Sequence, residues 1–229
     1  MPARKQLNFW TAKGRGVVFL LAATSIACLL FDFYQLCPMR TFTFFVFVPA
    51  LMALFAMAVA DRFWGNQQLW RGVRLGIRAG FIAAIAYDIF RLPFVFAKPL
   101  GLDVFFPALN LFKVFPRFGA MILGQPIEQA TYSLTAHVVG WIYHFSNGIT
   151  FGVMYVAMVN CPSRRTWAWG VLMALVLELG MLVTPYPGFF NIPISVAFIL
   201  ATLAAHTIFG MAMGVVVQRC SSKLSSAAI

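Results

Sequence analysis

Charged residues are scarce in this chain. Asp, Glu, Lys and Arg together make up 10% of its 229 residues, compared with about 25% in a typical soluble domain. Hydrophobic residues make up 62%, and several apolar runs approach the length of about twenty residues that crosses about 30 Å of hydrocarbon. This composition excludes an ordinary soluble protein. It predicts an all-α, polytopic membrane helical bundle in which residues 1–229 form a single integral membrane domain.

Sequence motifs of common enzymes and metal sites are also missing. There is no G-x-S-x-G elbow, no Walker A pattern, no H-E-x-x-H and no C-x-x-C-H. We therefore expect no conventional enzyme, although a membrane-embedded metalloenzyme stays open. The four cysteines form no C-x-x-C pair, so they predict neither a disulfide framework nor a structural zinc site. They are Cys28, Cys37, Cys161 and Cys220.

Acidic residues are the rarer charged class: there are 6 of them against 17 Lys and Arg, which gives a formal net charge of +11. A basic surplus can indicate nucleic-acid binding. Here, however, most Lys and Arg fall between alternate apolar segments, as the positive-inside rule predicts for membrane proteins. We therefore expect the lipid bilayer as a partner, and no nucleic acid.

Six apolar segments are predicted to cross the membrane as helices. They comprise residues 17–36, 42–60, 73–97, 134–159, 166–184 and 192–217. The first resembles the apolar part of a signal peptide, but no small-x-small cleavage site precedes Asp32 and the apolar run continues too far. We interpret this segment as a retained signal anchor.

The positions of Lys and Arg predict how these helices are oriented. One group of basic residues precedes the first segment, lies in alternate connections and follows the last segment. It comprises Arg4, Lys5, Lys13, Arg15, Arg62, Arg71, Arg74, Arg164, Arg165, Arg219 and Lys223. The opposite side holds Arg40, Lys98, Lys113 and Arg117. The richer side is expected to be the cytoplasm, which places both termini of this cell-membrane protein there.

The long connection formed by residues 98–133 differs from the others. It is rich in Phe, and four prolines and two basic residues, Lys113 and Arg117, interrupt its apolar part. We expect one or two interfacial or re-entrant helices on the outer face, with their apolar side in lipid. A structured loop and a lid over an outer-facing cavity are the alternatives.

One pattern of residues occurs twice. The motif H-x-x-x-G-x-x-x-G begins at His144 and again at His206, each time inside an apolar segment. The glycines of the two copies are Gly148, Gly152, Gly210 and Gly214. The repetition predicts that the third and fourth segments form a helix pair that is duplicated in the fifth and sixth.

An acidic residue lies in the preceding segment of each copy at matching positions. Asp88 follows Gly80 by eight residues, and Glu178 follows Gly170 by eight. Ionisable groups at membrane depth are costly, and for that reason they commonly mark functional sites. We therefore predict an intramembrane site for a metal ion or protons. Its residues are Asp88, His144, Glu178 and His206.

Structural roles for the same residues compete with this prediction. Arg91, three residues after Asp88, could neutralise that carboxylate within one helix. Glu178 has no basic neighbour in its own segment, so it is expected to be protonated or held by a partner from another helix. For His206, a hydrogen bond to a neighbouring helix is the simplest alternative.

Three further residues are expected to support the site or line access to it: His137, Asn147 and Arg91. His137 and His144 share a helix face, but seven residues separate them by roughly 10 Å along the axis. Both imidazoles therefore cannot bind one metal ion, since Zn–N bonds are about 2 Å long. His137 is expected near the outer surface.

Small residues recur every four positions in the third segment, which brings them to one helix face. Such residues let a neighbouring backbone approach closely, so we expect them, like the glycines of the repeated motif, to pack helices together. The residues of this ladder are Gly72, Gly76, Gly80 and Ala84.

Three functions remain open from the sequence. In the first, imidazoles and carboxylates line a path for protons or bind a divalent transition metal, since this ligand set suits Zn, Fe or Mn. In the second, His144 and His206 are the axial ligands of a haem, or bind a pigment. In the third, the polar groups only hold helices together in an accessory, scaffold or assembly subunit. That protein would associate with other membrane subunits or with further copies of itself.

Overall fold

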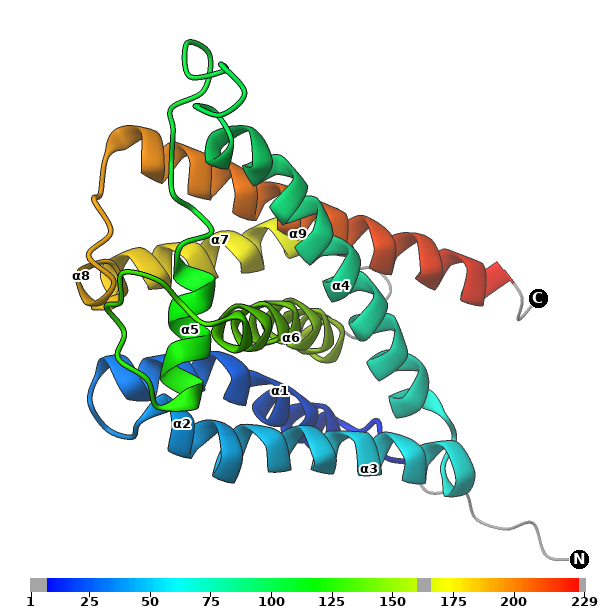
Figure 1. Ribbon diagram of the computed structural model, residues 1–229. Helices are drawn as coiled ribbons and strands as arrows, with labels where there is room; N and C mark the ends of the chain where they lie inside the picture. The colour runs from blue at the N-terminus through cyan, green and yellow to red at the C-terminus, as the bar shows by residue number, and fades with distance from the viewer. Residues whose placement is uncertain (1–7, 160–165, 227–229) are drawn as a thin grey trace, which may run out of the picture.

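The computed structural model describes residues 8–159 and 166–226, and over these residues the chain is helical, without β-strands (Figure 1). Some residues used to predict orientation and cysteine chemistry lie outside the described residues. They are Arg4, Lys5, Cys161, Arg164 and Arg165.

Each of the six predicted segments coincides with a long helix. The long helices are α1 (Ala12–Phe33), α3 (Val48–Trp64), α4 (Gln68–Val95), α6 (Leu134–Met158), α7 (Trp167–Val183) and α9 (Val196–Ser226). Without a break, α2 (Met39–Phe42) and a π-helical stretch, η1 (Thr43–Phe47), lead into α3. Two short helices, α5 (Val114–Leu123) and α8 (Tyr186–Phe189), lie in the connections.

Three helical stretches among the described residues are long and apolar enough to cross a membrane. They are Ala12–Phe33, Met39–Trp64 and Val196–Cys220. With 17 residues, α7 is also apolar but shorter, while α4 and α6 are long and carry several polar side chains. The fold is that of a helical membrane protein. Six spans stay a prediction.

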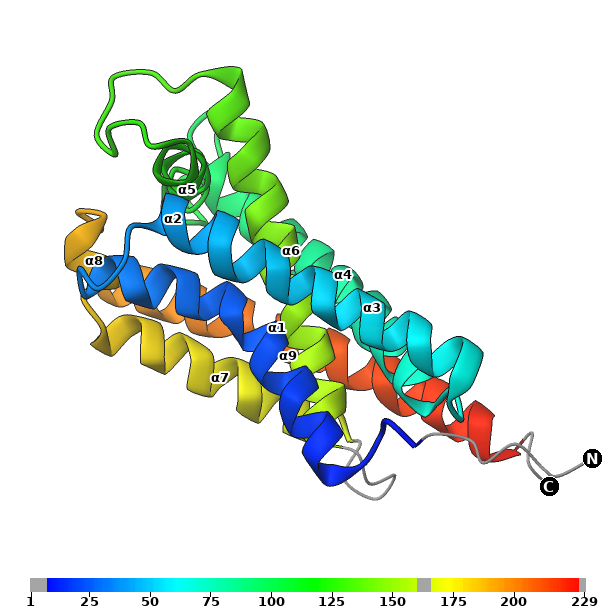
Figure 2. The same cartoon turned by 90° about the horizontal axis from the view of Figure 1, so that it is seen from below.

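The central helix of the bundle is α6, which packs against α1, α4 and α5. A second group forms around α9, which packs against α4 and α7. Figures 1 and 2 show α5 and α8 together at one end of the bundle. The turn between α3 and α4 and the end of α9 lie at the opposite end.

Side-chain caps explain where several helices begin. The hydroxyl of Thr11 accepts a hydrogen bond from the backbone N–H of Gly14 at the start of α1 (3.1 Å). Gln67, which precedes α4, has a left-handed backbone and provides no side-chain cap. The fully buried carboxylate of Asp61 takes that role from α3, because its Oδ2 accepts from the N–H of Trp70 (3.0 Å).

The position of α5 corrects the expectation that residues 98–133 form helices with an apolar side in lipid. Every residue of α5 except Leu123 is buried. This helix packs on α6, where a Cβ on Gly119 would collide with the Ala136 carbonyl and one on Gly140 with the Phe115 carbonyl. Since glycine lets the two backbones touch, the helix enters the protein interior. The rest of 98–133 consists of turns and irregular chain, as the loop alternative predicted.

Candidate functional site

Two helix crossings position the predicted site residues. At the first, α4 and α6 touch through glycines: a Cβ on Gly80 would collide with the carbonyl of Gly148, and one on Gly152 with the carbonyl of Gly76. Rising residue numbers on α4 meet falling numbers on α6, so these helices are antiparallel. Gly72, the first residue of the ladder, faces the ring of Trp10 instead, which would lie 2.9 Å from a Cβ added there.

The second crossing joins α7 and α9 in the same way. A Cβ on Gly210 would lie 2.6 Å from the Cα of Val171, and one on Gly170 would collide with the Gly210 carbonyl. Gly214 lies against the backbone of Trp167. In both crossings, the acidic residue lies eight residues after a contact glycine and the histidine four residues before one. The crossings therefore present their polar residues in matching positions.

At the first crossing, Asp88 of α4 and His144 of α6 form a pair. Oδ2 of Asp88 lies 2.9 Å from Nε2 of His144. Oδ1 of the same carboxylate lies 3.5 Å from Nη1 of Arg91, as an ion pair within α4. Arg91 also donates to the backbone carbonyl of Leu111, and its guanidinium lies 4.6 Å from the centre of the Tyr87 ring. The buried Asp88 carboxylate thus has a permanent cation beside it.

At the second crossing, Glu178 of α7 pairs with His206 of α9. Nδ1 of His206 lies 3.2 Å from Oε2 of Glu178 and 2.9 Å from the carbonyl oxygen of Thr202. Glu178 is buried, with 5% of its surface exposed. Met181 occupies the position that corresponds to Arg91 in α4. Among the described residues, this carboxylate therefore has an imidazole as its ion-pair partner and no arginine.

The contacts of His206 determine its tautomer. A backbone carbonyl can only accept a hydrogen bond, so Nδ1 must carry the hydrogen that it donates to Thr202. In the neutral imidazole, Nε2 is then the basic nitrogen. No described residue makes a hydrogen bond to Nε2, and His206 lines the cavity described next. This nitrogen is consequently available to accept a proton.

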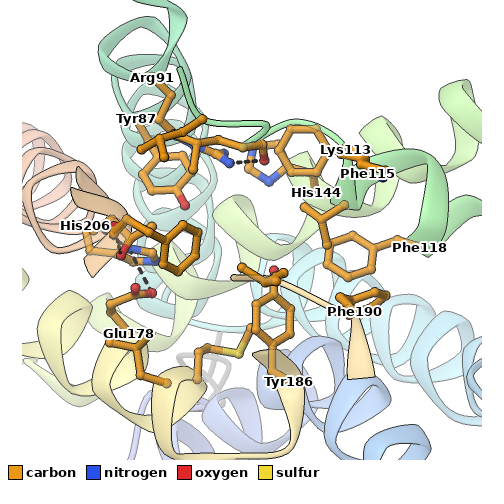
Figure 3. A pocket seen from close by; sticks show the side chains of 18 of the residues that line it. Tyr87, Arg91, Lys113, Phe115, Phe118, His144, Glu178, Tyr186, Phe190 and His206 are labelled. Atoms are coloured by element: carbon orange, nitrogen blue, oxygen red, sulfur yellow. Dashed lines mark hydrogen bonds and ion pairs between the residues drawn. The ribbon is translucent and has the colours of Figure 1, made fainter. Parts of the chain in front are cut away.

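A cavity of about 340 Å³ lies between the two crossings (Figure 3). His206 and Glu178 border it on one side and His144 on the other, while Tyr87 and Tyr186 enter it from opposite sides. The ring of Tyr87 contacts both imidazoles, with centroid separations of 6.0 Å to His144 and 4.9 Å to His206. The cavity therefore brings the two pairs together around one space.

The other predicted residues fall at different distances from this cavity. Arg91 and Asn147 line it, and Oδ1 of Asn147 is buried without a hydrogen-bond partner among the described residues. Asp88 lies behind Arg91 and His144 rather than in the cavity wall. His137 does not reach the cavity, since it is exposed and its ring lies 6.3 Å from that of Tyr132.

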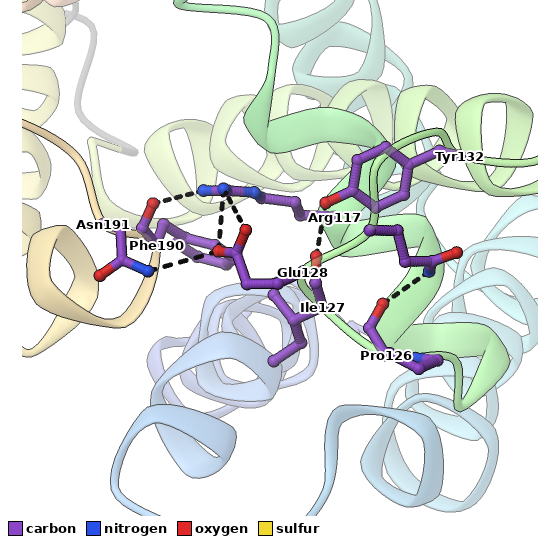
Figure 4. A network of polar contacts seen from close by, with 8 residues as sticks. Arg117, Pro126, Ile127, Glu128, Tyr132, Phe190 and Asn191 are labelled. Atoms are coloured by element: carbon purple, nitrogen blue, oxygen red, sulfur yellow. Dashed lines mark hydrogen bonds and ion pairs between the residues drawn. The ribbon is translucent and has the colours of Figure 1, made fainter.

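A polar network lies beside the cavity, between α5 and the turn that contains α8 (Figure 4). Nη2 of Arg117 donates to both carboxylate oxygens of Glu128, at 2.9 and 3.0 Å. Nη1 of the same guanidinium donates to the carbonyl of Phe190, and the amide of Asn191 donates to Glu128 (3.4 Å). Arg117 thereby connects α5 to the segment that joins α7 and α9.

Residues 71–227 of the chain match DUF6789, a family of unknown function. The match covers more than half of the chain. The protein belongs to this family. No curated protein and no solved structure matches the chain. The matched region contains both helix crossings, α5 and every cavity residue named above, whereas α1, α2 and α3 precede it.

Several cavity residues of this family member were not predicted from the sequence, among them Tyr87, Arg117 and Tyr186. The sequence does indicate Tyr87, because this residue directly precedes the acid Asp88 inside an apolar segment. Arg117 was expected on the outer face, in an interfacial or re-entrant helix or a loop, yet only 4% of its surface is exposed. Burial raises the pKa of the Tyr186 hydroxyl, so this group stays protonated and able to donate a hydrogen bond.

The geometry bears on the metal and haem alternatives. The described residues contain no group of three or more His, Cys, Asp and Glu side chains that could hold a metal ion. Each crossing offers one imidazole and one carboxylate, fewer than the three or four protein ligands of typical zinc sites. A haem ligated by both His144 and His206 would have to displace the Tyr87 ring from between them.

Proposed function

We propose that this protein crosses the cell membrane six times and conducts protons through an intramembrane site of histidines and carboxylates. Six long helices support the six spans, since each coincides with an apolar segment of the sequence. The site comprises the Asp88–His144 and Glu178–His206 pairs around their shared cavity.

The orientation that we propose places both termini in the cytoplasm. It is supported by the separation of the bundle into two ends, one with α5 and α8 and the other with the α3–α4 turn (Figures 1 and 2). Arg62 and Arg71 lie next to that turn, whereas Lys113 and Arg117 lie at or in α5. With the richer basic side in the cytoplasm, the cavity and the Arg117 network face outward.

We further propose that the helix pairs α4–α6 and α7–α9 arose by duplication. Matching positions of glycine, acid and histidine at the two crossings support this proposal. Such repeats are related by an axis along the membrane normal, an arrangement found among secondary transporters, whose sites lie at the repeat interface. The position of this cavity between the two pairs agrees with that arrangement.

The observation that carries the proton proposal is the difference between the two carboxylates. Asp88 is neutralised by Arg91, whatever the protonation state of His144. An ionised Glu178 beside a neutral His206 instead leaves the pair with one negative charge, which no arginine or lysine balances by a direct ion pair among the described residues. One added proton removes that charge, and net charge at membrane depth is costly. The Glu178–His206 pair therefore favours the binding of a proton, and Nε2 of His206 offers it an acceptor.

Protons suit this site better than a resident metal ion for two reasons. Neither crossing supplies the ligand number that structural or catalytic zinc requires. In addition, carboxylate and histidine side chains are the usual proton-relay groups of membrane pumps and transporters. Gentle purification followed by elemental analysis tests this preference directly, because a stoichiometric transition metal would contradict it.

Proton flux into vesicles tests the proposed function. The purified full chain is placed in liposomes that contain a pH-sensitive dye, and a pH step is applied with potassium and valinomycin present to prevent charge build-up. We expect flux well above that of empty liposomes, and a loss of it in the double variant His144→Ala/His206→Ala. His137→Ala is the matched control, since this exposed histidine lies outside the cavity. Undiminished flux in the double variant would refute the proposal.

An accessory or assembly role is the second candidate. In its favour, the described residues include an extensive exposed apolar surface, for example Phe45 and Val104 at 78% and 86% exposure. Lipid covers such a surface equally well in a protein that acts alone. Stoichiometric partner chains in the purified material, together with no proton flux, would favour this role.

A further inference from the structure

We propose that the cavity binds an organic carboxylate with an apolar body, such as a short aromatic acid or a medium-chain fatty acid. The inference rests on the proposed function in that it assigns a ligand to the same cavity. Its basis is separate, however, because the proposed donors are Lys113, Tyr87 and Tyr186, which are not members of the proton pairs.

The size of the cavity points to an organic molecule. A volume of about 340 Å³ lies in the lower part of the range, roughly 300–1,000 Å³, that small-molecule sites occupy. A proton or a single inorganic ion needs far less space. Aromatic side chains form much of the wall, including Phe115, Phe118 and Phe198. The body of a ligand that fills this space is therefore apolar.

The charges in the cavity wall point to an anion. Three cationic residues line the cavity, Arg91, Lys113 and Arg117, compared with one carboxylate, Glu178. The acids that accompany the two arginines, Asp88 and Glu128, are not part of the wall. The exposed Lys113 side chain has no ion-pair or hydrogen-bond partner among the described residues. Because each arginine is paired with one of these acids, Lys113 is the cation of the wall that is left to bind the anionic group of a ligand.

Two tyrosine hydroxyls complete the polar part of the wall. Tyr87 and Tyr186 enter the cavity from opposite sides (Figure 3), and neither hydroxyl has a hydrogen-bond partner among the described residues. A phenol donates one hydrogen bond, and a carboxylate offers several acceptor positions. The two hydroxyls and the Lys113 ammonium of the same wall are donors of the kind that bind a carboxylate. A neutral amide of the same shape matches them less well, because it lacks the charge and one acceptor oxygen.

Binding measurements on the full chain in lipid nanodiscs test this inference. The probes are 3-phenylpropionate, decanoate and 3-phenylpropionamide, each titrated by calorimetry against protein and against empty nanodiscs. We expect 3-phenylpropionate or decanoate to bind at least about tenfold more tightly than the amide, since hydrogen bonds to charged groups are the stronger ones. Tighter binding of 3-phenylpropionate would indicate a water-soluble ligand, and tighter binding of decanoate a ligand from the bilayer.

Variants connect binding to the named donors. Lys113→Gln, Tyr87→Phe and Tyr186→Phe are each expected to weaken carboxylate binding about 3- to 10-fold. Lys98→Gln and Tyr34→Phe are matched controls, since both residues are exposed and outside the cavity wall. An unchanged melting temperature in each variant verifies folding.

Three results would overturn the inference: no binding of either carboxylate, equal binding of acid and amide, or undiminished binding in all three cavity variants. Proton flux into liposomes without ligand is measured separately. Flux without carboxylate binding would remove only this inference, whereas binding without flux would remove only the proposed function.

Discussion

His206 and Glu178 form an imidazole–carboxylate pair between α9 and α7, with 3.2 Å between Nδ1 and Oε2. The same nitrogen donates a hydrogen bond to the Thr202 carbonyl (2.9 Å), so a contact within α9 orients the ring independently of Glu178. The pair at the other crossing differs because Arg91 accompanies Asp88. The Asp88–His144 pair, together with Arg91, is thus neutral without a bound proton. The Glu178–His206 pair becomes neutral only when it binds a proton.

Glu178→Gln is predicted to abolish proton flux and to leave the fold intact. Glutamine keeps the size of the side chain and leaves the Nδ1–H hydrogen bond of His206 to the Thr202 carbonyl in place, but it cannot ionise. We expect flux into liposomes to fall to the level of empty vesicles. The free energy of unfolding should change by less than about 1 kcal/mol, since no cation loses its partner.

Asp103→Asn is the matched control for this variant, because Asp103 is an exposed acid in the connection between α4 and α5. Its flux is expected to equal that of the unmodified chain. If Glu178→Gln conducts protons as well as Asp103→Asn does, the Glu178–His206 pair does not carry them.

Alanine at two glycines of α7 is predicted to have opposite consequences. A Cβ on Gly170 would collide with the Gly210 carbonyl, whereas a Cβ on Gly180 meets nothing within 4 Å. We expect Gly170→Ala to lower the free energy of unfolding by about 1–3 kcal/mol, the usual cost of overpacking. Gly180→Ala should leave it unchanged or raise it, since alanine is the better helix former.

Chemical unfolding in mixed detergent micelles compares these two variants on the same helix. Equal stability of Gly170→Ala and Gly180→Ala would mean that α7 and α9 do not touch through their backbones. Gly80→Ala provides an independent check at the other crossing, where a loss of similar size is expected because the Gly148 carbonyl lies against it.

The helices were predictable because their signal is local. Apolar runs and the positions of Lys and Arg are read from neighbouring residues, and each of the six predicted segments coincides with a helix. The predicted ends differ by a few residues; for example, α1 begins at Ala12 rather than residue 17, because Thr11 caps it. The third segment begins earlier than predicted as well, at Gln68, and the buried Asp61 at the end of α3 caps it through the N–H of Trp70.

The place of α5 could not be predicted in the same way. Its burial depends on Gly119 and Gly140 meeting across two helices, which is a property of the folded chain. Similarly, the cost of ionisable groups at depth identified Asp88 and Glu178, but tyrosine is common at membrane surfaces and gives no such signal. Only the packing of α4 between α6 and α9 places Tyr87 between two imidazoles.

Arg117→Lys is predicted to destabilise the end of the bundle that contains α5 and α8 (Figure 1), although it keeps the positive charge. Nη2 of Arg117 makes both hydrogen bonds to Glu128, while Nη1 binds the Phe190 carbonyl. Lysine has a single nitrogen in place of this fork, so it cannot hold Glu128 and the Phe190 carbonyl in the same geometry. We expect the free energy of unfolding to fall by about 1–3 kcal/mol. Arg40→Lys, at an exposed arginine of the same end, should have little effect, and equal stability of the two variants would contradict the role of the network.

Asp88→Asn is predicted to be far more damaging to stability than Glu178→Gln. It leaves the buried Arg91 guanidinium without its counter-charge, and removing one partner of a buried pair costs about 3–5 kcal/mol. The double variant Asp88→Asn/Arg91→Met removes both charges and should recover part of that loss. A double-mutant cycle on the free energy of unfolding measures the coupling between the two side chains. A coupling near zero would show that Arg91 does not neutralise Asp88, and the distinction between the two carboxylates would then be lost.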